Sequence, residues 1–166
     1  VYEHPITSLS LILTPADSGT RVVLNYLDND GPGGLEPITN SGTLKPETQY
    51  TARLILTNQN AASAFKTDHI IDSTTVAGLP EKHQVFYAAL DCLDLVTSYA
   101  DYDANGNPIG FLNTFKTGVN SEGRIRITIL HDPNKLGTNV FAGDMTNAAG
   151  KIDLQATLNV SIQHPL

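Results

Sequence analysis

The stretch Ile152-Asp153-Leu154-Gln155-Ala156-Thr157-Leu158-Asn159-Val160-Ser161-Ile162 decides the fold class of this chain. Every even-numbered residue in it is apolar and every odd-numbered residue is polar. Alternation with a period of two residues is typical of a β-strand that buries one face. The same pattern, or a short apolar run of strand length, occurs in residues 6–13, 21–27, 50–57, 83–90, 95–102, 111–119 and 123–130.

Turn-forming residues separate these stretches, and no convincing helical pattern lies between them. Residues 6–27 form a predicted hairpin, and Asn105-Gly106 is a strong turn signal between two further strands. Sheet-on-sheet packing is the economical way to bury so many one-sided strands. We therefore predict an all-β, immunoglobulin-like antiparallel β-sandwich of about eight or nine strands, with a small closed β-barrel as the alternative. The length of the chain suits a single domain spanning residues 1–166.

Composition excludes several classes of protein. The chain has 10 Lys and Arg against 17 Asp and Glu, a formal net charge of −7, which gives no electrostatic reason to bind nucleic acid. No apolar run is long enough to cross a membrane as a helix. The single cysteine, Cys92, cannot form an internal disulfide, and its apolar neighbours Leu90 and Leu93 predict a place in the core.

Three histidines at predicted strand ends suggest a metal site. His4 precedes the first strand, His83 begins one, and His131 ends another and is followed by Asp132. Strand ends meet at the poles of a sandwich, so these imidazoles could bind Zn²⁺ or Cu²⁺ with Asp132 as an oxygen ligand. His164, after the last strand, could join His4, and Glu3 could supply the oxygen ligand instead. The alternative is that they are ordinary polar residues, because no local His-x-His or His-x-x-x-His motif is present.

Two acidic loops are candidates for calcium binding or for simple turns. Asp28 and Asp30 precede Gly31, and Asp101, Asp103 and Asn105 precede Gly106. Oxygen side chains at alternate positions before a glycine resemble the start of a calcium loop, but the glutamate that completes an EF-hand is missing. The same residue types are what hairpin turns require, and we favour turns over Ca²⁺.

Signatures of catalysis are weak. There is no Gly-x-Ser-x-Gly motif, no glycine-rich phosphate loop and no pair of carboxylates at glycosidase spacing. We therefore predict that the protein is not an enzyme.

Several segments together resemble a family of small Bacteroidetes envelope lipoproteins. Family members carry segments such as VITT…LTP, EEHQFFY, RHEPNK and GDxTNAGG. The matching segments here, in chain order, are residues 6–9, 13–15, 28–31, 41–44, 48–51, 81–87, 103–110 (DANGNPIG), 131–135 and 143–147. His83 and His131 fall within two of them. Asp132 stands where the family tends to have Glu, and Leu130 where it has Arg.

The resemblance implies a cellular location more firmly than a biochemical activity. It implies a cell-envelope protein, anchored to the outer membrane or at the cell surface, with a lipid anchor in a segment ahead of Val1. It also makes Ser73, in Asp72-Ser73-Thr74, a possible O-glycosylation site. We expect a binding module for a metal ion or small nutrient beside an outer-membrane transporter. The alternative is a structural, adhesive or accessory subunit of a larger envelope complex.

Overall fold

The computed structural model describes residues 6–31, 33–57 and 79–164, and their strands form two sheets. The six-stranded sheet has the order β3 (Ile38–Thr39), β2 (Val22–Leu27), β1 (Ser8–Pro15), β5 (Gln49–Thr57), β8 (Leu112–Thr117) and β7 (Leu95–Tyr99). The four-stranded sheet has the order β4 (Gly42–Leu44), β10 (Lys151–Ile162), β9 (Ser121–His131) and β6 (His83–Leu90). Neighbouring strands are antiparallel except β4 and β10, which are parallel.

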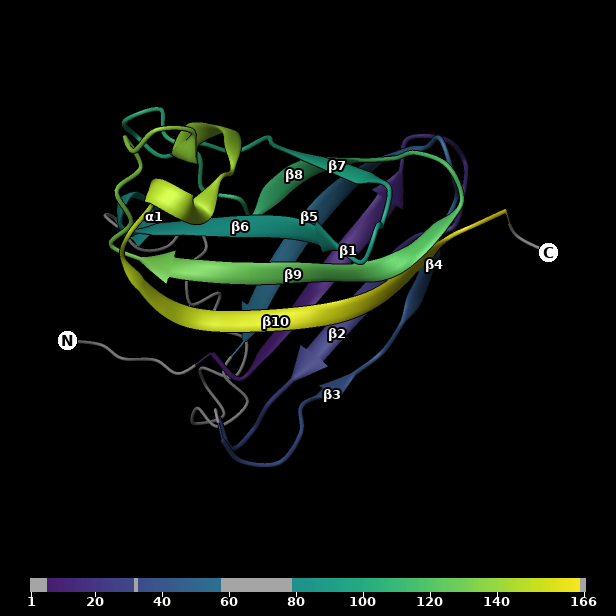
Figure 1. The fold of residues 1–166 in the computed structure, drawn as a ribbon, viewed down its shortest axis with the longest axis horizontal. Coiled ribbons are helices and arrows are strands. Elements are labelled where there is room, and N and C mark those ends of the chain that lie inside the picture. The colour runs from purple at the N-terminus through teal and green to yellow at the C-terminus, as the bar shows by residue number, and fades with distance from the viewer. Residues whose placement is uncertain (1–5, 32, 58–78, 165–166) are drawn as a thin grey trace.

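The two sheets form the two layers of a sandwich. In Figure 1 strands β6, β9 and β10 lie in front, and β1, β2 and β5 cross behind them at an angle. The structure confirms the predicted all-β sandwich, and the described strands do not close into a barrel. All the predicted strands are present, and the predicted hairpin is the β1–β2 pair. The sequence did not predict β3 and β4, which have only two and three residues.

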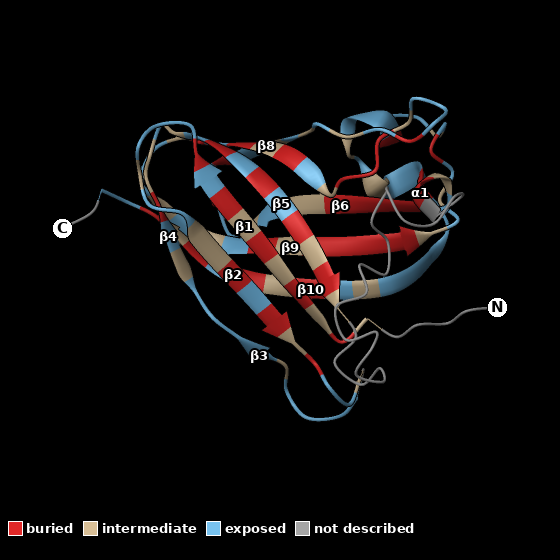
Figure 2. Ribbon diagram, turned by 180° about the vertical axis from the view of Figure 1, so that it is seen from behind, coloured by how far each residue is buried: buried red, intermediate tan, exposed pale blue. Residues whose placement is uncertain are grey.

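Apolar side chains that are buried at alternate positions of the strands hold the two layers together. Along β5 buried and more exposed residues alternate from Gln49 to Thr57, and Figure 2 shows the same banding on β1. The side chains between the sheets include Leu9, Leu11, Leu13, Tyr50, Leu54, Phe115, Ile125, Ile127, Ile129, Leu158 and Val160. Burying a side chain of this size stabilises the fold by about 1.5–3 kcal/mol. In the described part of the chain no helix is long and apolar enough to cross a membrane.

A second, smaller apolar cluster covers the outer face of the four-stranded sheet. The segment between β9 and β10 carries two 3₁₀ turns, η1 (Val140–Ala142) and η2 (Met145–Asn147). Val140 and Ala148 from this segment pack on Phe86 and Leu130 of the sheet, with Met145 at the margin. The predicted long loop is thus folded onto β6 and β9, next to the place where β9 ends at His131 (Figure 1).

A buried ion pair fixes this segment to the turn after β7. The side chains of Lys135 and Asp103 are only 5% and 1% exposed, and Lys135 Nζ lies 2.9 Å from Asp103 Oδ2. Lys135 Nζ also donates to the carbonyl oxygens of Pro80 (2.7 Å) and Pro108 (3.1 Å). Pro80 belongs to the short helix α1 (Leu79–Lys82), which leads directly into β6. One ammonium group therefore joins three chain segments that surround the start of β6.

Cys92 does not lie in the core, so that prediction is wrong. It is exposed, and it lies with Asp91 in the turn where the chain leaves β6 for the other sheet. Both residues have positive φ, 58° at Asp91 and 63° at Cys92. The apolar neighbour Leu93 is the residue that enters the core, 6% exposed. The tight turn separates neighbours that the sequence alone would place together.

The exposed thiol gives a simple test of this turn. We expect Cys92 to react with a thiol-specific reagent in the native protein at a rate close to that of the unfolded chain, because access limits the reaction of buried thiols. The comparison is labelling with and without denaturant. Labelling that is slowed about a hundredfold or more in the native state would contradict the exposed position.

Tyr99 links β7 to β6 and makes stability sensitive to alkaline pH. Its hydroxyl donates to Val85 O (2.8 Å) and accepts from Gln84 Nε2 (3.1 Å). Burial, opposed by the Gln84 hydrogen bond and assisted by the charge of Asp101, raises the pKa of Tyr99 to about 12. Because this pKa is above the unfolded value, the contribution is complete below about pH 10 and is lost between about pH 10 and 12.

We therefore expect the free energy of unfolding to fall over this range by up to about 1.4 kcal/mol per pH unit for this group. Denaturant unfolding at several pH values measures the slope. Tyr99→Phe should decline less steeply, and an equal decline in both proteins would show that Tyr99 is not responsible.

Candidate metal centre

His83 and His131 face each other across two neighbouring strands. His83 is the first residue of β6, His131 is the last of β9, and the two are direct partners in the antiparallel register. Such partners project from the same face of a sheet. Their rings meet edge-on, and His131 Nδ1 lies 2.8 Å from His83 Nε2. The predicted convergence of these two histidines is present in the structure.

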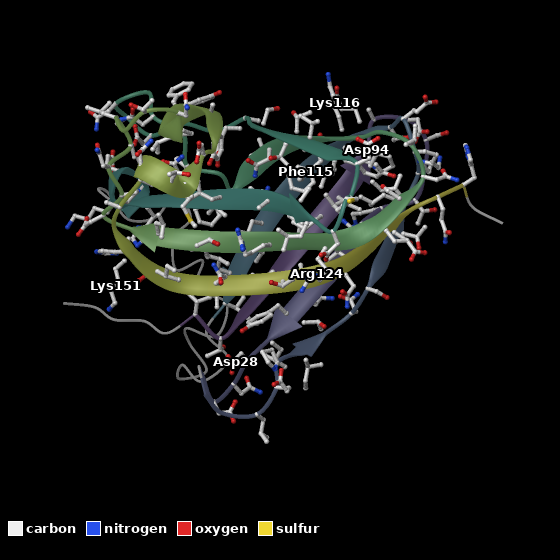
Figure 3. The ribbon with its side chains drawn as sticks, in the orientation of Figure 1. Asp28, Asp94, Phe115, Lys116, Arg124 and Lys151 are labelled. Carbon is white, nitrogen blue, oxygen red and sulfur yellow. The ribbon has the colours of Figure 1, made fainter. Side chains whose placement is uncertain are left out.

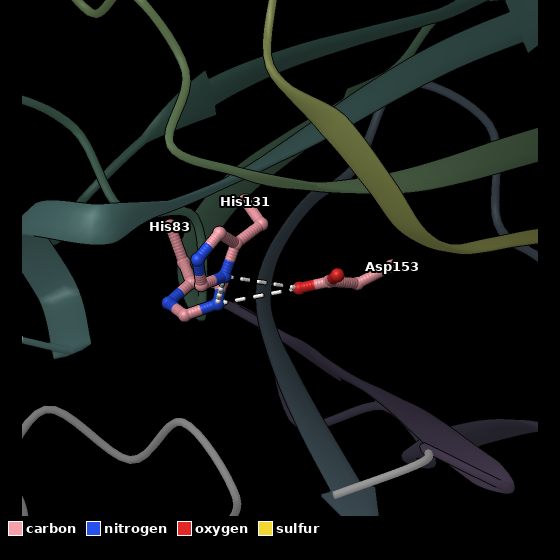
Figure 4. Close-up of side chains that lie close together, drawn as sticks. All are labelled: His83, His131 and Asp153. Carbon is pink, nitrogen blue, oxygen red and sulfur yellow. Dashed lines mark hydrogen bonds and ion pairs between the residues drawn. The ribbon is translucent and has the colours of Figure 1, made fainter. Parts of the chain in front are cut away.

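Asp153 completes the cluster from the third strand. Leu154 pairs with Ile129 and Ile152 with Leu130, so Asp153 is the extra residue of a β-bulge in β10. Strict alternation would place Asp153 on the face opposite to Leu154, away from the histidines. A bulge redirects the side chain, and Figure 4 shows the carboxylate reaching both imidazoles. Its Oδ2 lies 3.3 Å from His83 Nε2 and 3.6 Å from His131 Nδ1.

These three atoms have nearly the spacing of metal ligands. A tetrahedral Zn²⁺ with bonds of about 2.0–2.1 Å separates its ligand atoms by about 3.3–3.4 Å. The two nitrogen–oxygen distances, 3.3 and 3.6 Å, already match this spacing. The nitrogen–nitrogen distance of 2.8 Å would need to widen by about 0.5 Å. In the described part of the chain, this is the group of three or more His, Cys, Asp or Glu residues whose side chains lie close enough together to hold a metal ion.

Asp132 stands behind His131 rather than in the cluster. Its Oδ2 lies 3.3 Å from His131 Nε2, on the side of the ring away from His83 and Asp153. A proton on Nε2 facing Asp132 leaves the lone pair of Nδ1 directed at the cluster. Carboxylates commonly orient metal-binding histidines in this way. Asp132, predicted as a direct ligand, is therefore not part of the three-residue cluster, in which Asp153 supplies the carboxylate oxygen.

The cluster is enclosed on one side and open on the other. The side chain of His83 is 6% exposed, whereas those of Asp153 and His131 are 27% and 39% exposed. Solvent therefore reaches the cluster from the side of Asp153 and His131. A site with three protein ligands and an open fourth position would differ from the closed four-ligand sites that only stabilise a fold.

The other predicted metal ligands are not part of this cluster. His4, with Glu3, lies outside the described residues, as does the proposed glycosylation residue Ser73. His164 is exposed and follows the end of β10, whereas Asp153 and His131 lie at the start of that strand's pairing with β9. His164 is therefore at the opposite end of the sheet from His131.

The acidic loops use their carboxylates for turns. Asp28 accepts from Gly31 N and Tyr26 Oη, and Asp30 accepts from Leu35 N. The Leu35 hydrogen bond is the main reason that the pKa of Asp30 lies below its usual value. These oxygens point at the backbone of their own loop, as in Asx turns.

The second acidic loop is organised in the same way. Asp101 accepts from the backbone N–H groups of Gly110, Phe111 and Leu112. Burial nevertheless raises the pKa of Asp101 above its usual value. Asp103 accepts from Asn105 N and Asn107 N and pairs with Lys135, and the side chain of Asn105 is exposed. Backbone and lysine donors occupy these carboxylates, an arrangement that favours the turn interpretation over calcium binding.

Comparisons of this chain with protein-family models, with curated proteins and with solved structures found no match. The geometry of the His83–His131–Asp153 cluster is therefore the main guide to function.

Proposed function

We propose that this protein binds a divalent transition-metal ion, Zn²⁺ or Cu²⁺, through His83, His131 and Asp153, without catalysing a reaction. Two imidazole nitrogens and one carboxylate oxygen within 4.8 Å of one another carry the proposal. Imidazole suits both ions, and a single carboxylate is insufficient for Ca²⁺, which takes six to eight oxygen ligands.

The position of Asp132 fits the same assignment. Two imidazoles and a carboxylate can also form a hydrogen-bond network that only fixes strand ends. In such a network one of the two facing nitrogens carries the proton of the 2.8 Å contact between the rings. The carboxylate near Nε2 favours the His131 tautomer in which Nδ1 has a free electron pair, and this form can accept a hydrogen bond from His83 Nε2 or bind a metal ion that replaces that proton.

The cellular setting of the proposal rests on the family resemblance. We propose a lipid-anchored module of the cell envelope, at the outer membrane or cell surface, that holds the ion beside an outer-membrane transporter. The partly exposed ligands His131 and Asp153 fit an ion that is acquired and released. The ion is then cargo rather than a structural element.

Thermal unfolding with and without metal tests the proposal. An ion that binds only the folded state, at 100 times its Kd, stabilises the protein by about 2.7 kcal/mol. We expect Zn²⁺ or Cu²⁺ to raise the melting temperature and a chelator to reverse the rise. The matched control is His164→Ala, which removes an exposed histidine at the opposite end and should keep the full shift.

The double variant His83→Ala/His131→Ala gives the decisive comparison, with each protein measured against its own metal-free form. It should show no metal-dependent shift. The proposal fails if neither ion stabilises the wild-type protein, or if the double variant retains the wild-type shift.

A structural role at the envelope remains the second candidate, because β7 is an exposed sheet edge. It is the last strand of the six-stranded sheet, and Val96, its second residue, is 66% exposed. Open edges of this kind can pair with a strand of another protein. A stable partner that co-purifies with the protein from native envelopes supports this role, and a strictly monomeric protein counts against it.

A further inference from the structure

A groove lies on the outer face of the four-stranded sheet, separate from the metal cluster. It has a volume of about 490 Å³, within the range of small-molecule sites. Its floor is formed by β6 and β9, and the segment of residues 143–146 forms the other side. Phe86, Ala88 and Met145 contribute apolar surface, and Arg126 and Thr128 contribute polar groups.

Arg126 is the unusual residue of this groove. It is half-buried, and within the described residues its guanidinium has neither a hydrogen bond nor an ion pair. Other Lys and Arg side chains in that part of the chain do have ion-pair partners, as in Lys45–Asp17, Arg124–Asp91 and Lys135–Asp103. A half-buried cation without a partner is unexpected in a protein of net charge −7, where carboxylates are in excess.

Arg124 provides the contrast within the same strand. It is two residues away and on the same outer face, since Ile125 and Ile127 point into the core. Two of the three guanidinium nitrogens of Arg124 donate to Asp91, Nε at 2.5 Å and Nη2 at 3.2 Å. Figure 3 shows Arg124 on this face of the sheet, toward the end away from Lys151. One arginine of the pair thus already holds a carboxylate of the protein, and the other is available.

The surroundings of Arg126 define the class of anion that fits. Its register partner on β6 is the small residue Ala88, which leaves space beside the guanidinium. Buried Phe86 and half-buried Met145 line the same space and suit a short apolar group. The exposed carboxylate of Asp144 also lines the groove and disfavours multiply charged anions by repulsion. Arginine pairs with carboxylates through two parallel hydrogen bonds.

We infer that this groove binds a monoanionic carboxylate bearing a short apolar group, with Arg126 on the carboxylate and Phe86 and Met145 on the apolar group. Such a ligand is either a free organic acid or the carboxyl terminus of a peptide. The edge of β6 makes the peptide feasible. On that edge Val85 N donates to Ile109 O, and the backbone N–H groups of Tyr87 and Ala89, which point to the same edge, have no backbone partner there within the described chain.

Isovalerate is the probe, and Met145 is the reporter. Met145 is the only methionine of the chain, so a protein labelled with ¹³C-methyl methionine gives one resonance, from a residue that lines the groove. We expect isovalerate to shift this resonance in a saturable way. The uncharged isovaleramide and inorganic phosphate should each bind at least about tenfold more weakly, since one lacks the charge and the other the apolar group.

Arginine variants test the assignment. Arg126→Gln should weaken isovalerate binding at least about tenfold, and the matched variant Arg124→Gln should leave it unchanged. Should Arg126→Gln not fold, Ala88→Leu fills the groove while keeping the arginine and should abolish the shift. Equal binding by wild type and Arg126→Gln, or by wild type and Ala88→Leu, overturns the inference.

Peptides separate the two sources of the carboxylate. Acetyl-Ala-Val is compared with its C-terminal amide. Tighter binding of the peptide acid than of isovalerate identifies a peptide terminus, and the reverse identifies a free acid. Phosphate or the amides binding as well as the acids, or no saturable shift with either acid, refutes the site.

Discussion

Replacing Lys135 with methionine is expected to destabilise the protein by about 3–5 kcal/mol, the range for breaking a buried ion pair. The Asp103 carboxylate, 1% exposed, would lose its cation, and the carbonyl oxygens of Pro80 and Pro108 would lose a donor. Burial raises the cost because water cannot replace the missing partner. Denaturant unfolding of wild type and Lys135→Met measures the difference.

Two comparisons make this prediction specific. Lys45→Met removes the cation of an exposed pair, in which Lys45 is 36% and Asp17 is 53% exposed, and should cost less than about 1 kcal/mol. The double variant Lys135→Met/Asp103→Leu should regain part of the loss, because no unpaired charge remains buried. A cost below about 1 kcal/mol for Lys135→Met would contradict the role of this pair.

The same pair should contribute to acid sensitivity. Burial raises the pKa of Asp103, but hydrogen bonds from Lys135 and from the backbone of Asn107, together with the lysine charge, hold it below the usual value. A carboxyl whose folded pKa is lowered stabilises the fold above its unfolded pKa of about 4, and this contribution is lost as the pH falls through the folded value. Lys135→Met should therefore lose less stability than wild type on acidification below about pH 4.

The sequence predicts the strands well because burial of one face imposes a period of two residues. Residues 152–162 show this in pure form, and β10 runs from Lys151 to Ile162. Elements too short to show a period, such as β3, could not be predicted in this way. Cys92 shows the other limit, since a turn with two positive φ values separates it from the buried Leu93.

The candidate site could be predicted only in part. His83 and His131 stand at strand ends, and antiparallel pairing brings them together. Asp153 was missed because, under strict alternation, it is an ordinary outward-facing polar residue. Its place depends on a bulge, and a bulge is set by the register of β10 against β9, which no local pattern records. A carboxylate near the start of a strand that adjoins the histidines is a signal only after the strand order is known.

Substitution of Asp153 is the sharpest test of the metal ligands that we propose. Asp153→Asn keeps the size of the side chain and removes the charge of the oxygen ligand, so the affinity for Zn²⁺ should fall by more than about 100-fold. Asp132→Asn should reduce the affinity by about 10–100-fold, because in the site that we propose Asp132 contacts His131 and not the ion. Competition with a zinc-binding dye measures both affinities.

The order of the two effects distinguishes the ligand from the residue behind it. Asp91→Asn is the matched control, since Asp91 is an exposed carboxylate in the turn that follows the far end of β6 and should leave zinc binding unchanged. A larger loss in Asp132→Asn than in Asp153→Asn would make Asp132 the ligand and require the His131 ring to turn over. If neither variant loses affinity for Zn²⁺, neither carboxylate is a ligand. At most a two-histidine site then remains, which has too few ligands for a tetrahedral zinc centre.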